Sequence, residues 1–144
     1  MASRLSSLAV GDVVATADYP LSRASLVRYA GASGDFNPIH YRDDVAQSVG
    51  LPGVLAHGML TMGIAGSVVT DWCGSELEVT SFQVRFTKPV VVDPETGATL
   101  SVVASVGDIS ANEAGKPSAR IDLTVTSHTG EKVLGKAQMV VSPR

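Results

Sequence analysis

The segment from His57 to Thr70 is apolar on nearly every side, and it constrains the fold more than any other stretch. A helix with so little polar face is buried on most of its sides rather than laid on a surface. Its glycines, Gly58, Gly63 and Gly66, each lower helix propensity by about 1 kcal/mol. We expect this cost to be tolerated because strands or another helix approach the backbone closely at these positions.

Strands are predicted to follow this helix once the chain has passed Gly74. An alternating pattern predicts a strand within residues 76–92, and turn residues at 93–97, 112–117 and 128–130 divide the rest of the chain. The strands expected between and after these turns span residues 100–109, 119–127 and 133–141. A run of consecutive strands of this kind favours an antiparallel sheet.

Before the apolar helix, the sequence predicts one strand and two shorter helices. The strand covers residues 13–19 and is expected to end at Pro20, and the first helix runs from an N-cap at Ser22 to a stop at Gly31. A short helix over 43–49 begins with two acids. The order of strand, helices and then strands predicts an α+β fold in which an antiparallel sheet wraps the long helix. Such a sheet has an edge strand that needs a partner or protection.

The bulk properties favour one globular domain over residues 1–144. Charged residues make up only 17%, which suggests that a partner chain covers some apolar surface, and a net charge of −3 argues against a nucleic-acid partner. The one cysteine, Cys73, suits a reducing cytoplasm. Met1–Leu5 shows no secretory leader and Met59–Val69 is too short to span a bilayer, so we expect a cytoplasmic protein without a membrane partner.

The loop Ser33–His40 carries the residues best suited to chemistry. Asp35 and His40 could form an acid–base pair for proton transfer on a carbonyl compound. Gly34 permits an unusual backbone angle, Asn37 can orient a neighbour and Pro38 stiffens the segment. A polar turn without function would use the same residue types, and the density of constraint within eight residues is what favours a site.

Other residues near this loop allow several interpretations. Asp35, His40, Asp43, Asp44 and His57 could ligate a metal, but the sequence lacks a His-x-x-x-His motif or a cysteine pair, so we expect no metal.

The start of the apolar helix offers further candidates for substrate binding. Gly58 exposes an N–H at the positive end of the helix dipole, where it could hold a thioester oxygen. His57 is interpreted first as a residue that satisfies free backbone groups there. His57, Tyr41 and Asn37 are also kept as candidate substrate-binding residues, since Tyr41 adjoins the loop and Asn37 lies within it.

Two motifs resemble a known family. Gly34–His40, which reads Gly-Asp-Phe-Asn-Pro-Ile-His, resembles the signature of the MaoC-like (R)-specific enoyl-thioester hydratases and dehydratases. Ala56–Leu60, which reads Ala-His-Gly-Met-Leu, resembles their second shared block. The resemblance runs from about Leu21 to the C-terminus, and the chain looks most similar to the single-domain B subunits of actinobacterial (3R)-hydroxyacyl-ACP dehydratases.

The resemblance implies a hotdog fold, in which an antiparallel sheet wraps a long helix and dimers join two sheets into one. It implies that Asp35 and His40 are the catalytic pair, that Asn37 supports their geometry and that the Gly58 amide helps to bind the thioester carbonyl. The implied partners are a CoA or acyl-carrier-protein thioester and a second hotdog subunit, identical or related. No redox cofactor or metal is implied.

The implied reaction is the reversible dehydration of (3R)-hydroxyacyl thioesters to trans-2-enoyl thioesters, within fatty-acid metabolism and elongation. Two alternatives remain open from the sequence. One is a hotdog thioesterase, which would hydrolyse the thioester, and the other is a non-catalytic acyl-binding subunit of a dehydratase heterodimer. The intact Asp35 and His40 favour the dehydratase over both of these alternatives.

Overall fold

The computed structural model describes residues 4–144, and the first three residues of the expected leaderless N-terminus lie outside this range. The elements, in chain order, are η1 (Arg4–Ser7), β1 (Val13–Leu21), α1 (Arg23–Ser33), η2 (Pro38–His40), α2 (Asp43–Ser48), α3 (Gly58–Cys73), β2 (Leu77–Phe86), β3 (Ala98–Ala111), β4 (Pro117–Ser127) and β5 (Leu134–Pro143). Within the described residues, no helix is long and apolar enough to cross a membrane.

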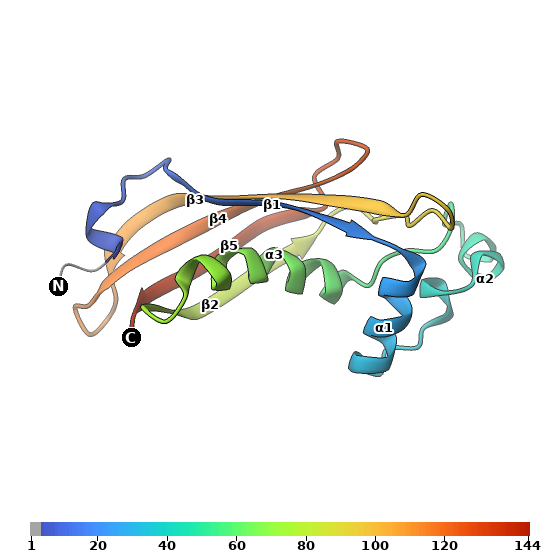
Figure 1. Ribbon diagram of the computed structural model, residues 1–144, viewed down its shortest axis with the longest axis horizontal. Coiled ribbons are helices and arrows are strands. Elements are labelled where there is room, and N and C mark those ends of the chain that lie inside the picture. The colour runs from blue at the N-terminus through green and yellow to red at the C-terminus, as the bar shows by residue number, and fades with distance from the viewer. Residues whose placement is uncertain (1–3) are drawn as a thin grey trace.

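The strands form one five-stranded sheet in the order β1-β3-β4-β5-β2, and every neighbouring pair is antiparallel. Helix α3 lies along one face of this sheet and contacts all five strands (Figure 1). Helices α1 and α2 lie together beyond one end of α3, away from the two termini (Figure 1). This is the α+β arrangement expected from the sequence, and it is a hotdog fold.

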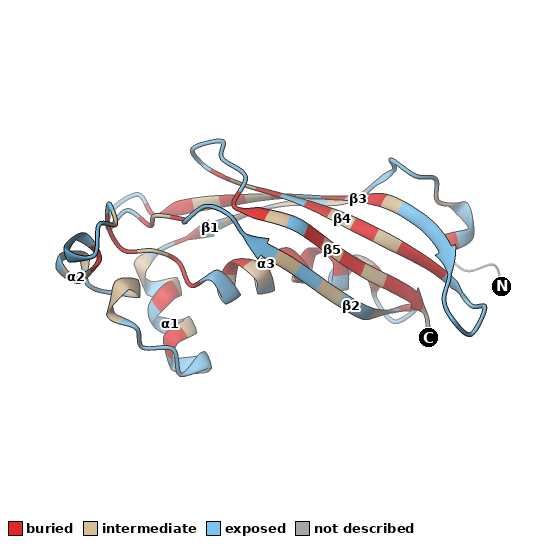
Figure 2. Cartoon of the chain, turned by 180° about the vertical axis from the view of Figure 1, so that it is seen from behind, coloured by how far each residue is buried: buried red, intermediate tan, exposed pale blue. Residues whose placement is uncertain are grey.

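The core lies between α3 and the inner face of the sheet. Alternate residues of β3, including Leu100, Val102 and Ala104, are buried, and they share one cluster with Ala65 and Val69 of α3. Burial is heaviest on β3, β4 and β5, whereas β2 is mostly exposed or half-buried (Figure 2). Strand β2 pairs with β5 alone among the described strands, so its other edge is free.

Close approach explains two of the three helix glycines. A Cβ atom on Gly66 would lie 2.8 Å from the Phe82 ring, and one on Gly58 would lie 3.1 Å from the Phe86 ring. At Gly63 a Cβ atom would meet nothing within 4 Å, so the expectation of close packing is wrong at that position. Two aromatic rings of β2 therefore pack directly against the backbone of α3.

Some predicted boundaries differ from the structure. Pro20 lies inside β1, which tolerates it because β1 is an edge strand. Helix α1 continues through Gly31 to Ser33, and its C-cap is Gly34, whose backbone is left-handed (φ 76°). Strand β2 ends at Phe86 rather than near residue 92.

The residues beyond Phe86 pair with a different segment. The Ala56 N–H donates to the Val90 carbonyl oxygen (2.9 Å), and the Val92 N–H donates to the Val54 carbonyl oxygen (3.0 Å). Residues 90–92 therefore fasten the stretch that precedes α3, and this stretch in turn borders the loop that carries Asp35 and His40.

The two types of glycine environment give the first prediction. Alanine at Gly63 should raise the free energy of unfolding by up to about 1 kcal/mol, because it improves helix propensity in open space. Alanine at Gly66 gains the same propensity but overlaps the Phe82 ring, which costs about 1–3 kcal/mol. Urea unfolding should therefore show Gly66→Ala to be less stable than Gly63→Ala. Equal stability of the two variants would contradict this packing.

Candidate active site

Three side chains shape the loop between α1 and η2. The Ser33 hydroxyl accepts the Asp35 N–H (3.1 Å), Asp35 Oδ1 accepts the Asn37 N–H (3.2 Å) and Asn37 Oδ1 accepts the Ile39 N–H (3.2 Å). Each contact spans two residues, which is the pattern of consecutive side-chain turns. The loop is thus rigid through its own hydrogen bonds, and Asn37 acts on the backbone within it.

His40 is held by the segment that precedes α3. Its Nδ1 atom lies 2.7 Å from the Leu55 carbonyl oxygen, and the Leu55 N–H donates back to the Ile39 carbonyl oxygen (3.1 Å). Because a carbonyl oxygen can only accept, Nδ1 carries the proton. The other ring nitrogen, Nε2, then faces Asp35 Oδ2 at 3.9 Å.

The two groups differ in exposure. The Asp35 side chain is 51% exposed, whereas that of His40 is 11% exposed. A separation of 3.9 Å is longer than a hydrogen bond, and it suits two groups that contact a third atom between them. The loop therefore presents a carboxylate and an imidazole nitrogen toward the same point.

A cavity of about 350 Å³ opens beside His40 and ends at the N-terminus of α3. Leu55, Phe86, Val90 and Leu134 give it apolar walls, and Gly58 lies on its surface. No hydrogen bond within the described residues occupies the Gly58 N–H, which is the first of a 16-residue helix. Its position makes it a donor for a negatively polarised oxygen, aided by the helix dipole.

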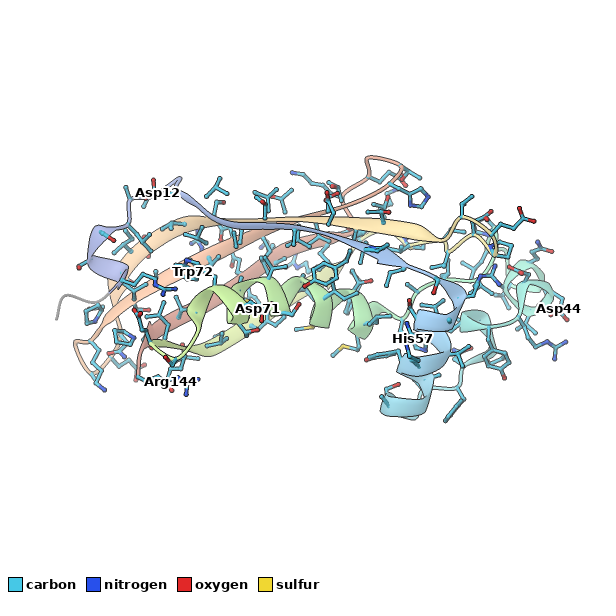
Figure 3. The ribbon with its side chains drawn as sticks, in the orientation of Figure 1. Asp12, Asp44, His57, Asp71, Trp72 and Arg144 are labelled. Carbon is cyan, nitrogen blue, oxygen red and sulfur yellow. The ribbon has the colours of Figure 1, made fainter. Side chains whose placement is uncertain are left out.

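His57 takes a place that the sequence did not predict. It is the N-cap residue of α3, and its carbonyl oxygen accepts the Leu60 and Thr61 N–H groups, but its side chain makes no capping hydrogen bond, so the interpretation that this side chain satisfies the helix end is wrong. It is 1% exposed, and its Nε2 atom donates to the Asp35 carbonyl oxygen at 3.1 Å. Figure 3 shows it beside α1 rather than along the sheet.

Aromatic contacts surround the His57 ring. It stacks on the His40 ring with 3.9 Å between centroids, and Tyr29 meets it edge-on at 4.7 Å. Its Nδ1 atom is buried without a hydrogen-bond partner, an arrangement that costs about 1–3 kcal/mol. Burial lowers the pKa of His57, with a smaller lowering from His40, so the ring is neutral at pH 7.

The remaining candidates fall outside the cavity. Tyr41 is exposed and does not line it, and the exposed Asn37 serves the backbone instead. Two groups that contact the site histidines were not predicted from the sequence. Tyr29 had a signal in the sequence, because it follows Leu26 by three residues and therefore lies on the same face of α1, whereas the carbonyl of Leu55 has none.

The five possible metal ligands separate into two groups. Ligand atoms of Asp35, His40 and His57 lie within 4.8 Å of one another. Asp43 and Asp44 are engaged elsewhere, by Arg23 and Arg42. The hydrogen bond from Arg23 lowers the pKa of Asp43, and a second one, from the Val54 N–H, adds to this effect. Asp43 therefore fastens the N-terminus of α1 to the stretch before α3.

Comparison with known proteins places this geometry in a family context. The family described as MaoC-like domain matches residues 6–128. A 3-hydroxyacyl-thioester dehydratase X of Mycobacterium tuberculosis is 36% identical over 77 residues, which cover 54% of this chain and 26% of the relative. An (R)-specific enoyl-CoA hydratase of Rhodospirillum rubrum is 31% identical over 87 residues, which cover 60% of each chain.

A solved structure described as a MaoC-like dehydratase superposes with a TM-score of 0.84 and 34% sequence identity. The match covers 96% of this chain and 42% of that one. The chain thus spans less than two thirds of the length of each of these relatives.

The buried neutral His57 gives a prediction for stability against pH. Below about pH 6.5 the unfolded chain binds a proton at His57 that the folded chain does not, so the free energy of unfolding falls as pH falls. The loss is up to about 1.4 kcal/mol per pH unit. His57→Gln should flatten this slope between pH 6.5 and 5 in urea titrations.

The exposed His128 provides the matched control. His128→Gln removes a histidine that lies in the exposed turn between β4 and β5, so it controls for the loss of a histidine far from the site. Asp43, Asp44 and Asp93, whose pKa values are lowered from 3.8, retain their contributions throughout this pH range. Equal slopes for the wild type and His57→Gln would contradict the burial of a neutral His57.

Proposed function

Because the chain belongs to the MaoC-like domain family, we propose that it catalyses the reversible dehydration of (3R)-hydroxyacyl thioesters to trans-2-enoyl thioesters. The observation that carries this proposal is the facing pair on one loop, with Asp35 Oδ2 3.9 Å from His40 Nε2 beside an apolar cavity. The names of the relatives, a dehydratase of 3-hydroxyacyl thioesters and an (R)-specific enoyl-CoA hydratase, support it.

In the hydration direction, the pair holds a water molecule. An oxygen about 2.8 Å from each of two atoms that lie 3.9 Å apart can bond to both. The water oxygen bonds to C3 of the enoyl thioester, one water proton passes to the pair, and the pair delivers a proton to C2. In dehydration, the C2 proton passes to the pair, and the C3 hydroxyl receives a proton from the pair and departs as water. Because both groups sit on one loop, water adds to one face of the substrate.

The N-terminus of α3 supplies the second element. The Gly58 N–H donates to the thioester carbonyl oxygen as that oxygen gains negative charge in the enolate-like transition state. The absence of a side chain at Gly58 keeps this N–H accessible beside the Phe86 ring. The acyl chain occupies the apolar cavity, and Asn37 preserves the shape of the loop.

We further propose that residues 1–144 act as one hotdog domain in the cytoplasm, on a CoA or carrier-protein thioester. A second hotdog subunit, identical or related, would cover the free edge of β2. Exposed apolar residues such as Met59 at the start of α3 and Phe86 at the end of β2 support such a partner.

Replacement of the carboxylate tests the reaction. Asp35→Asn should lower kcat for hydration of crotonyl-CoA by about 10²–10⁴-fold, because the amide cannot exchange a proton with water or substrate. The fold should be unaffected, since Asp35 is half-exposed. The assay follows loss of the enoyl-thioester absorbance, and thiol release is measured in parallel.

Asp71→Asn is the matched control, because Asp71 is exposed on the last turn of α3. Its turnover should equal that of the wild type. Near-normal hydration by Asp35→Asn would overturn the assignment, and thiol release without hydration would identify a thioesterase instead.

The proposed chemistry also predicts an outcome for metal removal. The thioester itself acidifies the C2 proton, and the His40 Nδ1–H donates to the Leu55 carbonyl oxygen, which leaves Nε2 facing Asp35 to exchange a proton with water. Dialysis against EDTA should therefore leave kcat within about twofold of its starting value. A loss of activity that Zn²⁺ or Mn²⁺ restores would assign Asp35, His40 and His57 to a metal centre.

A further inference from the structure

His57 is a buried titratable residue that has no step in the proposed reaction. It is 1% exposed and does not line the cavity, so substrate does not reach it. A core position this close to a site could be filled by an aliphatic residue without the cost of a buried, unpartnered Nδ1 atom. The contacts that the ring does make are therefore informative.

Each of these contacts leads to a different member of the acid–base pair. The Nε2–H group donates to the main-chain carbonyl oxygen of Asp35 at 3.1 Å, which fixes the residue that carries the carboxylate. The flat face of the ring stacks on His40 with 3.9 Å between centroids and 24° between planes. One side chain thus spans the two ends of the loop.

We propose that His57 is a positioning residue, which sets the distance and orientation between the Asp35 carboxylate and the His40 imidazole through these two contacts. This inference rests on the proposed function, because it assigns the pair as the reacting groups. It replaces the expectation that His57 binds substrate directly.

Histidine combines an N–H donor with a flat ring, whereas glutamine and phenylalanine each supply only one of the two. Glutamine could donate an N–H to the Asp35 carbonyl, but it lacks a ring to support His40. Phenylalanine could support His40, but it lacks the donor. The edge-on contact of Tyr29 at 4.7 Å and 62° packs against the same ring, so α1 holds the support in place.

The neutral form of the ring is required for this role. A protonated His57 would put a positive charge against the His40 ring, and the proton on Nδ1 would have no acceptor among the described residues. The titratable groups that face His57 are Asp35, His40 and Tyr29. Burial lowers its pKa, in keeping with a ring that stays uncharged while the pair exchanges protons.

The test separates the two contacts. His57→Gln keeps the donor and His57→Phe keeps the ring, and both are compared with the wild type for hydration of crotonyl-CoA. Each variant should lower kcat by about 10–100-fold and change KM by less than about threefold, because misplacement of reacting groups weakens the chemical step rather than binding. Val69→Ala, a buried change further along α3, should lower thermal stability but leave kcat within about twofold.

Histidine NMR on ¹⁵N-labelled protein reads the positioning without turnover. The wild type should show His40 protonated on Nδ1, as the bond to Leu55 requires, and His57 protonated on Nε2. In His57→Gln and His57→Phe, the His40 resonances should shift and broaden, whereas in Val69→Ala they should not.

The outcomes distinguish this proposal from the one on which it rests. Folded His57 variants with kcat within threefold of the wild type, or with unchanged His40 resonances, would overturn the positioning role. A wild-type protein without hydration of any crotonyl thioester would overturn the proposed function, and the NMR comparison would then decide alone whether His57 orders His40.

Discussion

Burial of α3 against the sheet is the constraint on which the other parts depend. The helix can lie this close because Gly58 and Gly66 let the rings of Phe86 and Phe82 rest on its backbone. Its N-terminus is thereby fixed at the end of the sheet, where it borders the cavity. The segment Val54–Ala56 leads into the helix and is hydrogen-bonded to residues 90–92 on one side and to Ile39 and His40 on the other.

The sequence was informative where periodicity and local chemistry decide the structure. The apolar helix and its five flanking strands follow from the spacing of apolar residues and turns, and the loop Gly34–His40 follows from the types of residue gathered in it. Contacts between residues that are far apart in the chain could not be predicted from the sequence. Nothing in the spacing shows that Leu55 holds His40, or that His57 reaches the Asp35 carbonyl across 22 positions of the chain. The predicted strand beyond Phe86 failed for the same reason, since those residues pair with the entry to α3.

The site combines rigid and solvated parts. Main-chain carbonyls orient both imidazoles, so each ring presents a defined nitrogen without the need for a buried charge. The Asp35 carboxylate remains half-exposed to solvent. The free-energy cost of charge burial is therefore small at this site, because the carboxylate is the group with most access to water.

The hydrogen bonds of the Asp35 side chain remain local, and this has an evolutionary consequence. Its carboxylate bonds to the backbone of its own loop, while the core is built from α3 and the sheet without it. A duplicated copy of such a domain can therefore lose its carboxylate by mutation and still build the same helix, sheet and cavity. Copies with and without the carboxylate can therefore diverge from one gene at little cost in stability.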